Sequence, residues 1–158
     1  MSVRTRGMPA GWEVERSLLG GLLLDPASLP TIRETLRAEH FHRPTHAALY
    51  RLLCRLADGG TPADVTVVLD AAHAAGELER YGGAVYLLAL PMACPSVDNL
   101  PAYATRIRNH AIRRQLIFRA SAIVERAGDG DERRDAVARR GRDRWREGDD
   151  GNAKALTY

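Results

Sequence analysis

The residues best suited to chemistry in this 158-residue chain are three closely spaced histidines, His40, His42 and His46. Imidazole is a common zinc ligand, and structural zinc sites hold the metal with four protein ligands. If Pro44 begins a helix, as its residue type favours, His42 lies outside that helix and cannot share a face with His46. Glu39 is the only adjacent acid, and no cysteine is nearby. We therefore predict no metal, and we interpret His46 as a residue that caps or packs the helix.

The other candidates for catalysis have structural interpretations. Asp64 precedes an apolar segment and is expected to cap a helix. Cys54 and Cys94 are isolated thiols that lack the paired spacing of a zinc site, and we expect no disulfide in a reducing compartment. His110 lies among arginines and is expected to be solvated. The single lysine, Lys154, does not follow the Gly-rich loop that an ATP-driven motor needs. The sequence predicts no catalytic residue, no cofactor and no ATP hydrolysis.

The basic residues are distributed unevenly along the chain. Residues 1–103 carry 9 basic and 11 acidic side chains, whereas residues 104–158 carry 14 and 9. A basic rear half predicts an anionic partner, DNA phosphates among the candidates, and such binding would weaken steeply with salt. Trp145 has two interpretations that stay open: it stacks on a base, or it packs on a neighbouring helix with Val137. The candidate phosphate-contacting residues are Arg133, Arg134, Arg139, Arg140, Arg142, Arg144 and Arg146.

The spacing of apolar residues predicts an all-α fold. Leucines recur at three- and four-residue intervals in successive segments, which is the pattern of helices with one buried face. Gly20 and Gly21 would weaken the first helix, so we expect them to permit a close approach by another helix. The predicted helices cover residues 12–24, 28–38, 44–58, 65–76 and 84–90. Together they predict a compact five-helix head over residues 12–98, after a flexible segment at 1–11.

The rear half is predicted to form a basic helical hairpin over residues 99–147. A first arm at 100–127 would reach a turn at 128–131, and a return arm at 132–147 would lie antiparallel to it. Residues 148–158 are predicted to be a disordered tail. No apolar run approaches the roughly 20 residues that cross a bilayer, and no secretion signal is visible, so we expect a cytoplasmic protein. The predicted packing residues of the hairpin are Tyr103, Ile107, Ala111, Leu116 and Ile123.

Five short motifs occur in a fixed order between residues 13 and 123. They are E-x-x-x-L-G-x-x-L-x-D from Glu15 to Asp25, F-x-x-x-x-H from Phe41 to His46, G-x-P-x-D from Gly60 to Asp64, G-x-L-x-x-x-G-G-x-x-Y-L from Gly76 to Leu87, and an apolar pattern that opens at Tyr103, Ala104 and Ile107. In this order they resemble the N-terminal domain of the DnaB-type replicative DNA helicase. The third motif departs slightly, because Thr66 comes one position earlier than in that family.

This resemblance implies a role in DNA replication through assembly and docking. In that family such domains associate through their hairpins, form a collar on the hexameric motor, and provide a platform for primase and loader proteins. The implied partners are a replicative helicase motor, a primase or helicase loader, and further copies of the chain. We expect the chain to stand alone without the ATPase motor. Arg106 and Arg113 occupy hairpin positions where the family has apolar residues, and such charges oppose close packing unless acids face them.

A second function is consistent with the same residues. A small DNA-binding or regulatory protein could use the helical head as a scaffold and contact phosphates through Arg133 to Arg146. Such a protein would bind DNA with little sequence preference. A truncated remnant with little function is the third alternative, and an enzyme acting alone is the least favoured.

Overall fold

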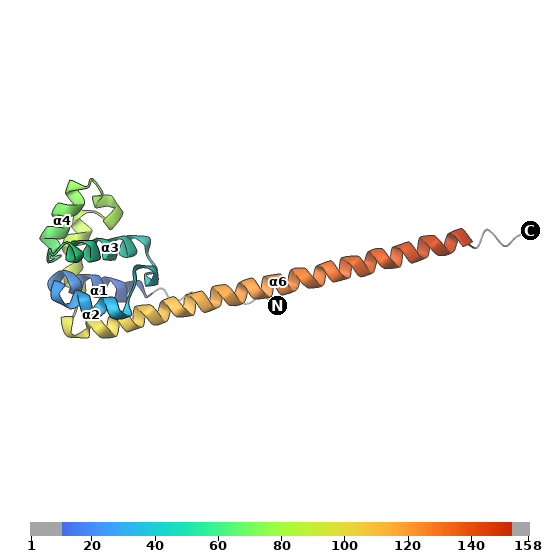
Figure 1. The fold of residues 1–158 in the computed structure, drawn as a ribbon, viewed down its shortest axis with the longest axis horizontal. Coiled ribbons are helices and arrows are strands. Elements are labelled where there is room, and N and C mark those ends of the chain that lie inside the picture. Colours follow the sequence, from blue (N-terminus) through green and yellow to red (C-terminus); the bar gives the residue numbers. More distant parts are fainter. Residues whose placement is uncertain (1–10, 153–158) are drawn as a thin grey trace, which may run out of the picture. The chain divides into compact units, whose positions relative to one another are not determined.

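The computed structural model describes the backbone of residues 11–152 and the side chains of residues 11–128 and 135–140. Every regular element in this part of the chain is helical, which confirms the all-α prediction. The α-helices are α1 (Trp12–Leu24), α2 (Leu29–Thr35), α3 (Pro44–Asp58), α4 (Val65–Ala74), α5 (Ala84–Ala89) and α6 (Leu100–Asn152) (Figure 1). Short 3₁₀ turns cover Pro26–Ser28, Ala38–His40, Leu78–Tyr81, Leu90–Ala93 and Val97–Asn99. No described helix is long and apolar enough to cross a membrane.

The core of the head forms around α1. Its residues Leu18, Leu19 and Leu22 are almost completely buried, and the helix contacts both α3 and the turn at 90–93 (Figure 1). A Cβ atom added at Gly20 would lie 2.0 Å from the backbone oxygen of Leu90. Only a residue without a side chain allows the two backbones to come this close. The glycine pair therefore permits a close approach, as predicted, although the partner is a 3₁₀ turn.

The helix ends follow local rules at most positions. α1 ends at Leu24 just before Asp25 and a proline, and α3 begins at Pro44, as predicted. Asp64 caps α4, because its Oδ1 accepts a hydrogen bond of 2.9 Å from the backbone nitrogen of Val67. Gly82 has a φ of 97°, a left-handed conformation that ends the preceding 3₁₀ turn. The first three of these boundaries agree with the predictions made from the sequence.

The second predicted helix is wrong at both ends. The sequence indicated residues 28–38, whereas α2 covers Leu29–Thr35 and a separate 3₁₀ turn follows it. Leu36 is extended, with φ −116° and ψ 137°, and its side chain is buried in the core. Its carbonyl oxygen accepts a hydrogen bond of 3.1 Å from the hydroxyl of Tyr50. A contact with α3 therefore replaces the last turn that helical periodicity predicts.

The chain divides into two compact units, one ending at Gln115 and one beginning at Leu116. The first unit includes the opening residues of α6, whereas the head was predicted to end at residue 98. Leu100, Ala104 and Ile107 of α6 are buried in the same hydrophobic core as α1 and α3. The start of α6 is therefore an integral part of the head.

The predicted hairpin is not formed within the chain. α6 is helical through residues 128–131, where a turn was predicted, and through the predicted return arm at 132–147. Gly128 and Gly130 cost only about 1 kcal/mol each in a helix. Val137, the one large apolar side chain described in that arm, is exposed. The helix also reaches Asn152, within the predicted disordered tail at 148–158. Residues 1–10 and 153–158 lie outside the described part of the chain.

Candidate docking surface

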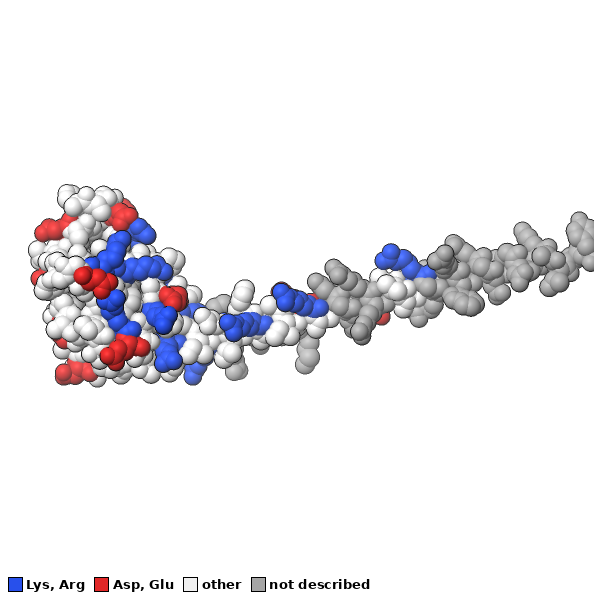
Figure 2. Space-filling model, viewed as in Figure 1, with Lys and Arg blue, Asp and Glu red and all other residues white. Residues whose placement is uncertain are grey.

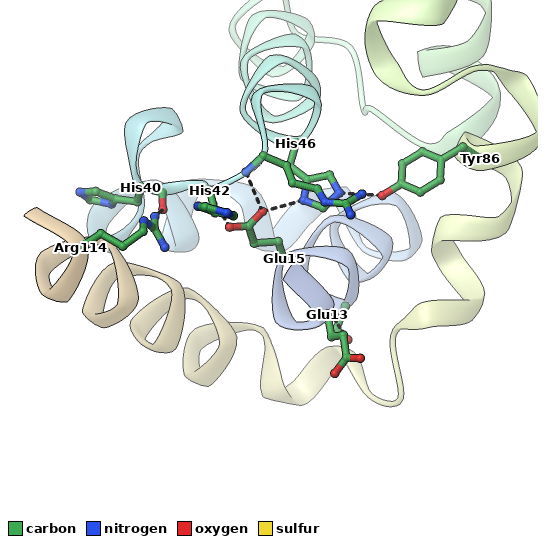
Figure 3. Close-up of polar contacts among 9 residues, drawn as sticks. Glu13, Glu15, His40, His42, His46, Tyr86 and Arg114 are labelled. Atoms are coloured by element: carbon green, nitrogen blue, oxygen red, sulfur yellow. Dashed lines mark hydrogen bonds and ion pairs between the residues drawn. The ribbon is translucent and has the colours of Figure 1, made fainter. Parts of the chain in front are cut away.

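A buried polar network joins three of the sequence motifs at the centre of the head. The carboxylate of Glu15 on α1 accepts hydrogen bonds from the backbone nitrogens of His42, at 2.6 Å, and Arg43, at 3.4 Å. It also lies 2.6 Å from Nδ1 of His46 on α3, whose Nε2 lies 2.6 Å from the hydroxyl of Tyr86 on α5 (Figure 3). The network therefore connects α1, the start of α3 and α5.

The protonation pattern of the network follows from its donors and acceptors. A neutral imidazole with its proton on Nδ1 donates to Glu15 and accepts from Tyr86 at Nε2, which satisfies all three groups. Burial raises the pKa of Tyr86, so its hydroxyl keeps the proton that it donates. Glu15 is 2% exposed and His46 is 0% exposed, so a dissolved substrate cannot reach them. The network therefore acts in positioning helices.

The three histidines separate into three different environments. His46 packs inside the head, which confirms the structural interpretation of that residue. Nδ1 of His40 accepts a hydrogen bond of 3.1 Å from the backbone nitrogen of Arg37, and His42 contributes its backbone nitrogen to Glu15. Of the described residues, no group of three or more His, Cys, Asp or Glu is arranged to hold a metal ion. The three histidines are therefore close in sequence but form no common site.

A second polar contact fixes the start of α6 on the head. Nη2 of Arg114 donates a hydrogen bond of 2.7 Å to the backbone oxygen of His40 (Figure 3). His110, one turn earlier, is half-buried, whereas the sequence analysis expected it to be solvated. Burial and the nearby Arg106 and Arg113 lower the pKa of His110. Arg106 and Arg113 themselves are exposed.

The predicted packing residues fall into two groups. Ile107 and Ala111 are buried in the head, and Tyr103 packs against the same core, so these three side chains stabilise the head itself. Leu116 and Ile123, in the second unit, are 61% and 68% exposed. Of the five predicted packing residues, only Leu116 and Ile123 remain available to a partner.

Three further large apolar residues are exposed in the second unit and were not predicted from the sequence. Ile117 is 40% exposed, Phe118 is 75% exposed and Val124 is 67% exposed. Leu116 and Ile123 are seven residues apart, as are Ile117 and Val124, so the four side chains form two adjacent rows on one side of α6. We call them the 116–124 stripe. The paired seven-residue spacing was the signal in the sequence that could have identified it.

The structure describes only part of the predicted phosphate-contacting segment. Arg139 and Arg140 are exposed, and Nε of Arg139 donates to the backbone oxygen of Asp135 at 3.4 Å. The side chains of Arg133, Arg134, Arg142, Arg144, Arg146 and Trp145 lie outside the described residues. A contact of this segment with phosphates therefore remains a prediction.

Comparison with known proteins now identifies the family. The protein-family model described as the DnaB-like helicase N terminal domain matches residues 7–109 of this chain. The matched residues include Glu15, His46 and Tyr86 of the buried network. The chain belongs to this family. It is 35% identical over 129 residues to the replicative DNA helicase DnaB of Geobacillus stearothermophilus, an alignment that covers 82% of this chain. The match covers most of the head and reaches into α6.

Two solved structures agree with this assignment. The crystal structure of the N-terminal domain of DnaB helicase from Mycobacterium tuberculosis has a TM-score of 0.71 and 33% identity, and the match covers 75% of this chain and 86% of that one. A structure of a DnaB-like replicative helicase and its interactions with primase has a TM-score of 0.61 and 27% identity, covering 72% of this chain and 27% of that one. The chain thus resembles the N-terminal domain of larger helicases.

The alignment with the Geobacillus helicase spans 28% of that protein's length. The part that is matched is the N-terminal domain and excludes the ATPase motor of the helicase. The 158 residues contain no Gly-rich loop that ends in Gly-Lys-Ser or Gly-Lys-Thr. Because that loop holds the nucleotide phosphates in such motors, these residues do not hydrolyse ATP by that mechanism.

Proposed function

We propose that this DnaB-like domain serves DNA replication in the cytoplasm as an assembly and docking module. Its partners would be further helicase subunits, a primase or a helicase loader. The observation that carries the proposal is the 116–124 stripe, an apolar surface on a helix that none of the described residues of its unit covers. The resemblance to a DnaB-like helicase whose structure includes its interactions with primase supports the same class of partner.

The stripe has an energetic reason to find a partner. Full burial of a leucine, isoleucine or valine side chain contributes about 1.5–3 kcal/mol, and the four residues are each 40–68% exposed. Covering them would therefore contribute on the order of 4–6 kcal/mol before the costs of association. Long helices in proteins gain most of their stability from packing one face. A partner helix on the stripe would supply that packing.

The stripe can be tested by its effect on association. Light scattering after size-exclusion chromatography would measure the mass of the purified chain, alone and with the primase of the same organism. We expect the wild-type chain to form an assembly. The double variant Leu116→Ala with Ile123→Ala should weaken that assembly, because alanine preserves the helix and removes the apolar contact. Gln115→Ala with Arg119→Ala is the matched control, since both side chains are exposed polar neighbours of the stripe. A wild-type chain that stays monomeric and ignores primase would contradict the proposal.

The second candidate function is DNA binding by the basic rear half. The exposed Arg139 and Arg140 support it, because guanidinium groups of this kind reach phosphate oxygens without rearrangement of a core. Filter binding of single- and double-stranded DNA across a range of salt would test it. This function would be supported if DNA retention falls steeply with salt. The double variant Arg139→Gln with Arg140→Gln should also reduce that retention. No retention at low salt would exclude it.

A further inference from the structure

The head carries a groove lined by arginines that a docking role leaves unexplained. The groove lies between α2 and α3 and has a volume of about 560 Å³. Arg33 and Arg37 line one wall, from α2 and the residues after it, and Arg51 and Arg55 line the other, from α3. Figure 2 shows basic side chains gathered on one face of the head. We call these four residues the arginine groove.

This concentration of positive charge is not a consequence of a basic head. Residues 1–103 contain 9 basic and 11 acidic side chains, and nearly half of those basic residues line this one groove. Arg51 and Arg55 are four residues apart on α3, so their side chains are neighbours on one helix face. Like charges at this spacing destabilise a helix. An anion in the groove would convert this repulsion into attraction.

The guanidinium groups have few partners of their own. Arg33 pairs with Asp58 through two hydrogen bonds, of 2.6 Å and 3.4 Å. Arg55 donates to the hydroxyl of Tyr81 at 3.4 Å. Within the described part of the chain, neither Arg37 nor Arg51 forms an ion pair. The groove therefore holds an excess of positive charge with donors directed toward solvent.

We infer that the arginine groove binds phosphate groups, carried by a nucleic-acid strand or a free nucleotide. Both carboxylate oxygens of Asp58 accept hydrogen bonds from the same guanidinium group, that of Arg33. A tetrahedral phosphate presents oxygens in several directions, so it can accept from both walls of a groove at once. This site lies in the head, it is separate from Arg133 to Arg146, and it does not depend on the docking proposal.

Cys54 allows the site to be tested without a substitution. It lines the arginine groove, whereas Cys94, the other thiol of the chain, packs beside Gly21 of α1. Burial raises the pKa of Cys54, so alkylation would be followed at mildly alkaline pH. We expect short oligo(dT) to slow alkylation of Cys54 at least about threefold and to leave Cys94 unchanged, because ligands that bind the folded groove cover one thiol only.

Parallel probes distinguish the source of the phosphate. If ATP or inorganic phosphate protects Cys54 only at much higher concentration than oligo(dT), the ligand is a nucleic-acid strand. If ATP protects as well as oligo(dT), the groove recognises free nucleotides. Protection of Cys54 by polyglutamate at the same charge concentration would overturn the inference in favour of an acidic peptide. The absence of protection by all four probes would also overturn it.

A pair of charge-matched variants gives an independent measurement. Arg37→Gln with Arg51→Gln removes two groove arginines that have no ion-pair partner among the described residues. We expect about tenfold weaker binding of fluorescent oligo(dT) at low salt, and a slope of log affinity against log salt that is less negative by about 1.4. Arg106→Gln with Arg108→Gln removes the same charge from exposed positions outside the groove. Equal loss in both variants would overturn the inference, and matching circular dichroism melts would confirm that both fold.

Discussion

Replacing Glu15 by leucine tests whether the buried network determines the stability of the head. Leucine has a similar size but accepts no hydrogen bond, so the backbone nitrogens of His42 and Arg43 and the ring of His46 would lose their shared acceptor. The pair of Glu15 and His46 is almost completely buried, so water would not replace the carboxylate. We therefore expect a large loss of folding free energy.

The magnitude follows from the two short contacts. Hydrogen bonds to charged groups contribute about 1.5–3 kcal/mol each, so the two contacts at 2.6 Å account for about 3–6 kcal/mol. The contact with Arg43, at 3.4 Å, adds little. A domain of this size is stable by only about 5–15 kcal/mol.

Urea unfolding followed by circular dichroism would measure the change. With a slope of about 2 kcal/mol per molar urea, a loss of about 4 kcal/mol lowers the unfolding midpoint by about 2 M. Glu13→Leu is the matched control, because Glu13 lies on the same helix with an exposed side chain (Figure 3), and we expect it to change stability by less than about 0.5 kcal/mol. Equal midpoints for the two variants would refute the reasoning that the network holds the helices together.

Three further predictions concern other parts of the chain. Gly20→Ala should destabilise the head by about 1–3 kcal/mol, since its Cβ would meet the oxygen of Leu90 at 2.0 Å; an unchanged melting temperature would contradict this. Gly128→Ala should raise helical content and stabilise α6 by about 0.5–1 kcal/mol, because nothing lies within 4 Å and the site is helical; decreased helicity would support a turn there. Burial lowers the pKa of His40 below 6.5, so the unfolded chain binds the proton more readily and stability should fall as pH drops below 6.5. Because neutral Nδ1 accepts from Arg37, His40→Gln should reduce this pH dependence of the urea midpoint, and an unaltered dependence would exclude His40 as its source.

The head could be predicted well because its helices obey local rules. The buried leucines of α1 and α3 repeat at helical spacing, and Asp64 caps α4 through its own side chain. The error at α2 arose where a distant residue decides the outcome. Leu36 lies outside the helix, with its side chain in the core and its carbonyl oxygen accepting a hydrogen bond from the hydroxyl of Tyr50. No local sequence pattern predicts a contact with a residue fourteen positions away. The same limit applies to Glu15 and Tyr86, because their sequence motifs carry no sign of the network that joins them through His46.

The candidate site could be predicted only in part from apolar residues listed without their rotation about the helix axis. Ala111 and Leu116 are five residues apart, which on an ideal helix is a rotation of about 140° beyond one full turn. They therefore cannot mark one face, although both were assigned to one row of packing residues. The structure places Ala111 in the core of the head, while Leu116 is exposed in the second unit. Counting in steps of seven, as for Leu116 and Ile123, identifies the exposed row correctly.

The arginine groove shows a different limit of sequence reasoning. Arg33 and Arg55 are separated by more than twenty positions in a segment whose overall charge is slightly negative, so composition gives no sign of a basic site. The rear half, in contrast, is visibly basic and attracted the prediction of phosphate contact. Electrostatic attraction depends on charges that converge in space, where low-dielectric walls strengthen their combined field. A groove formed by two helices can therefore concentrate more usable charge than a longer run of arginines interleaved with acids such as Asp135 and Asp143.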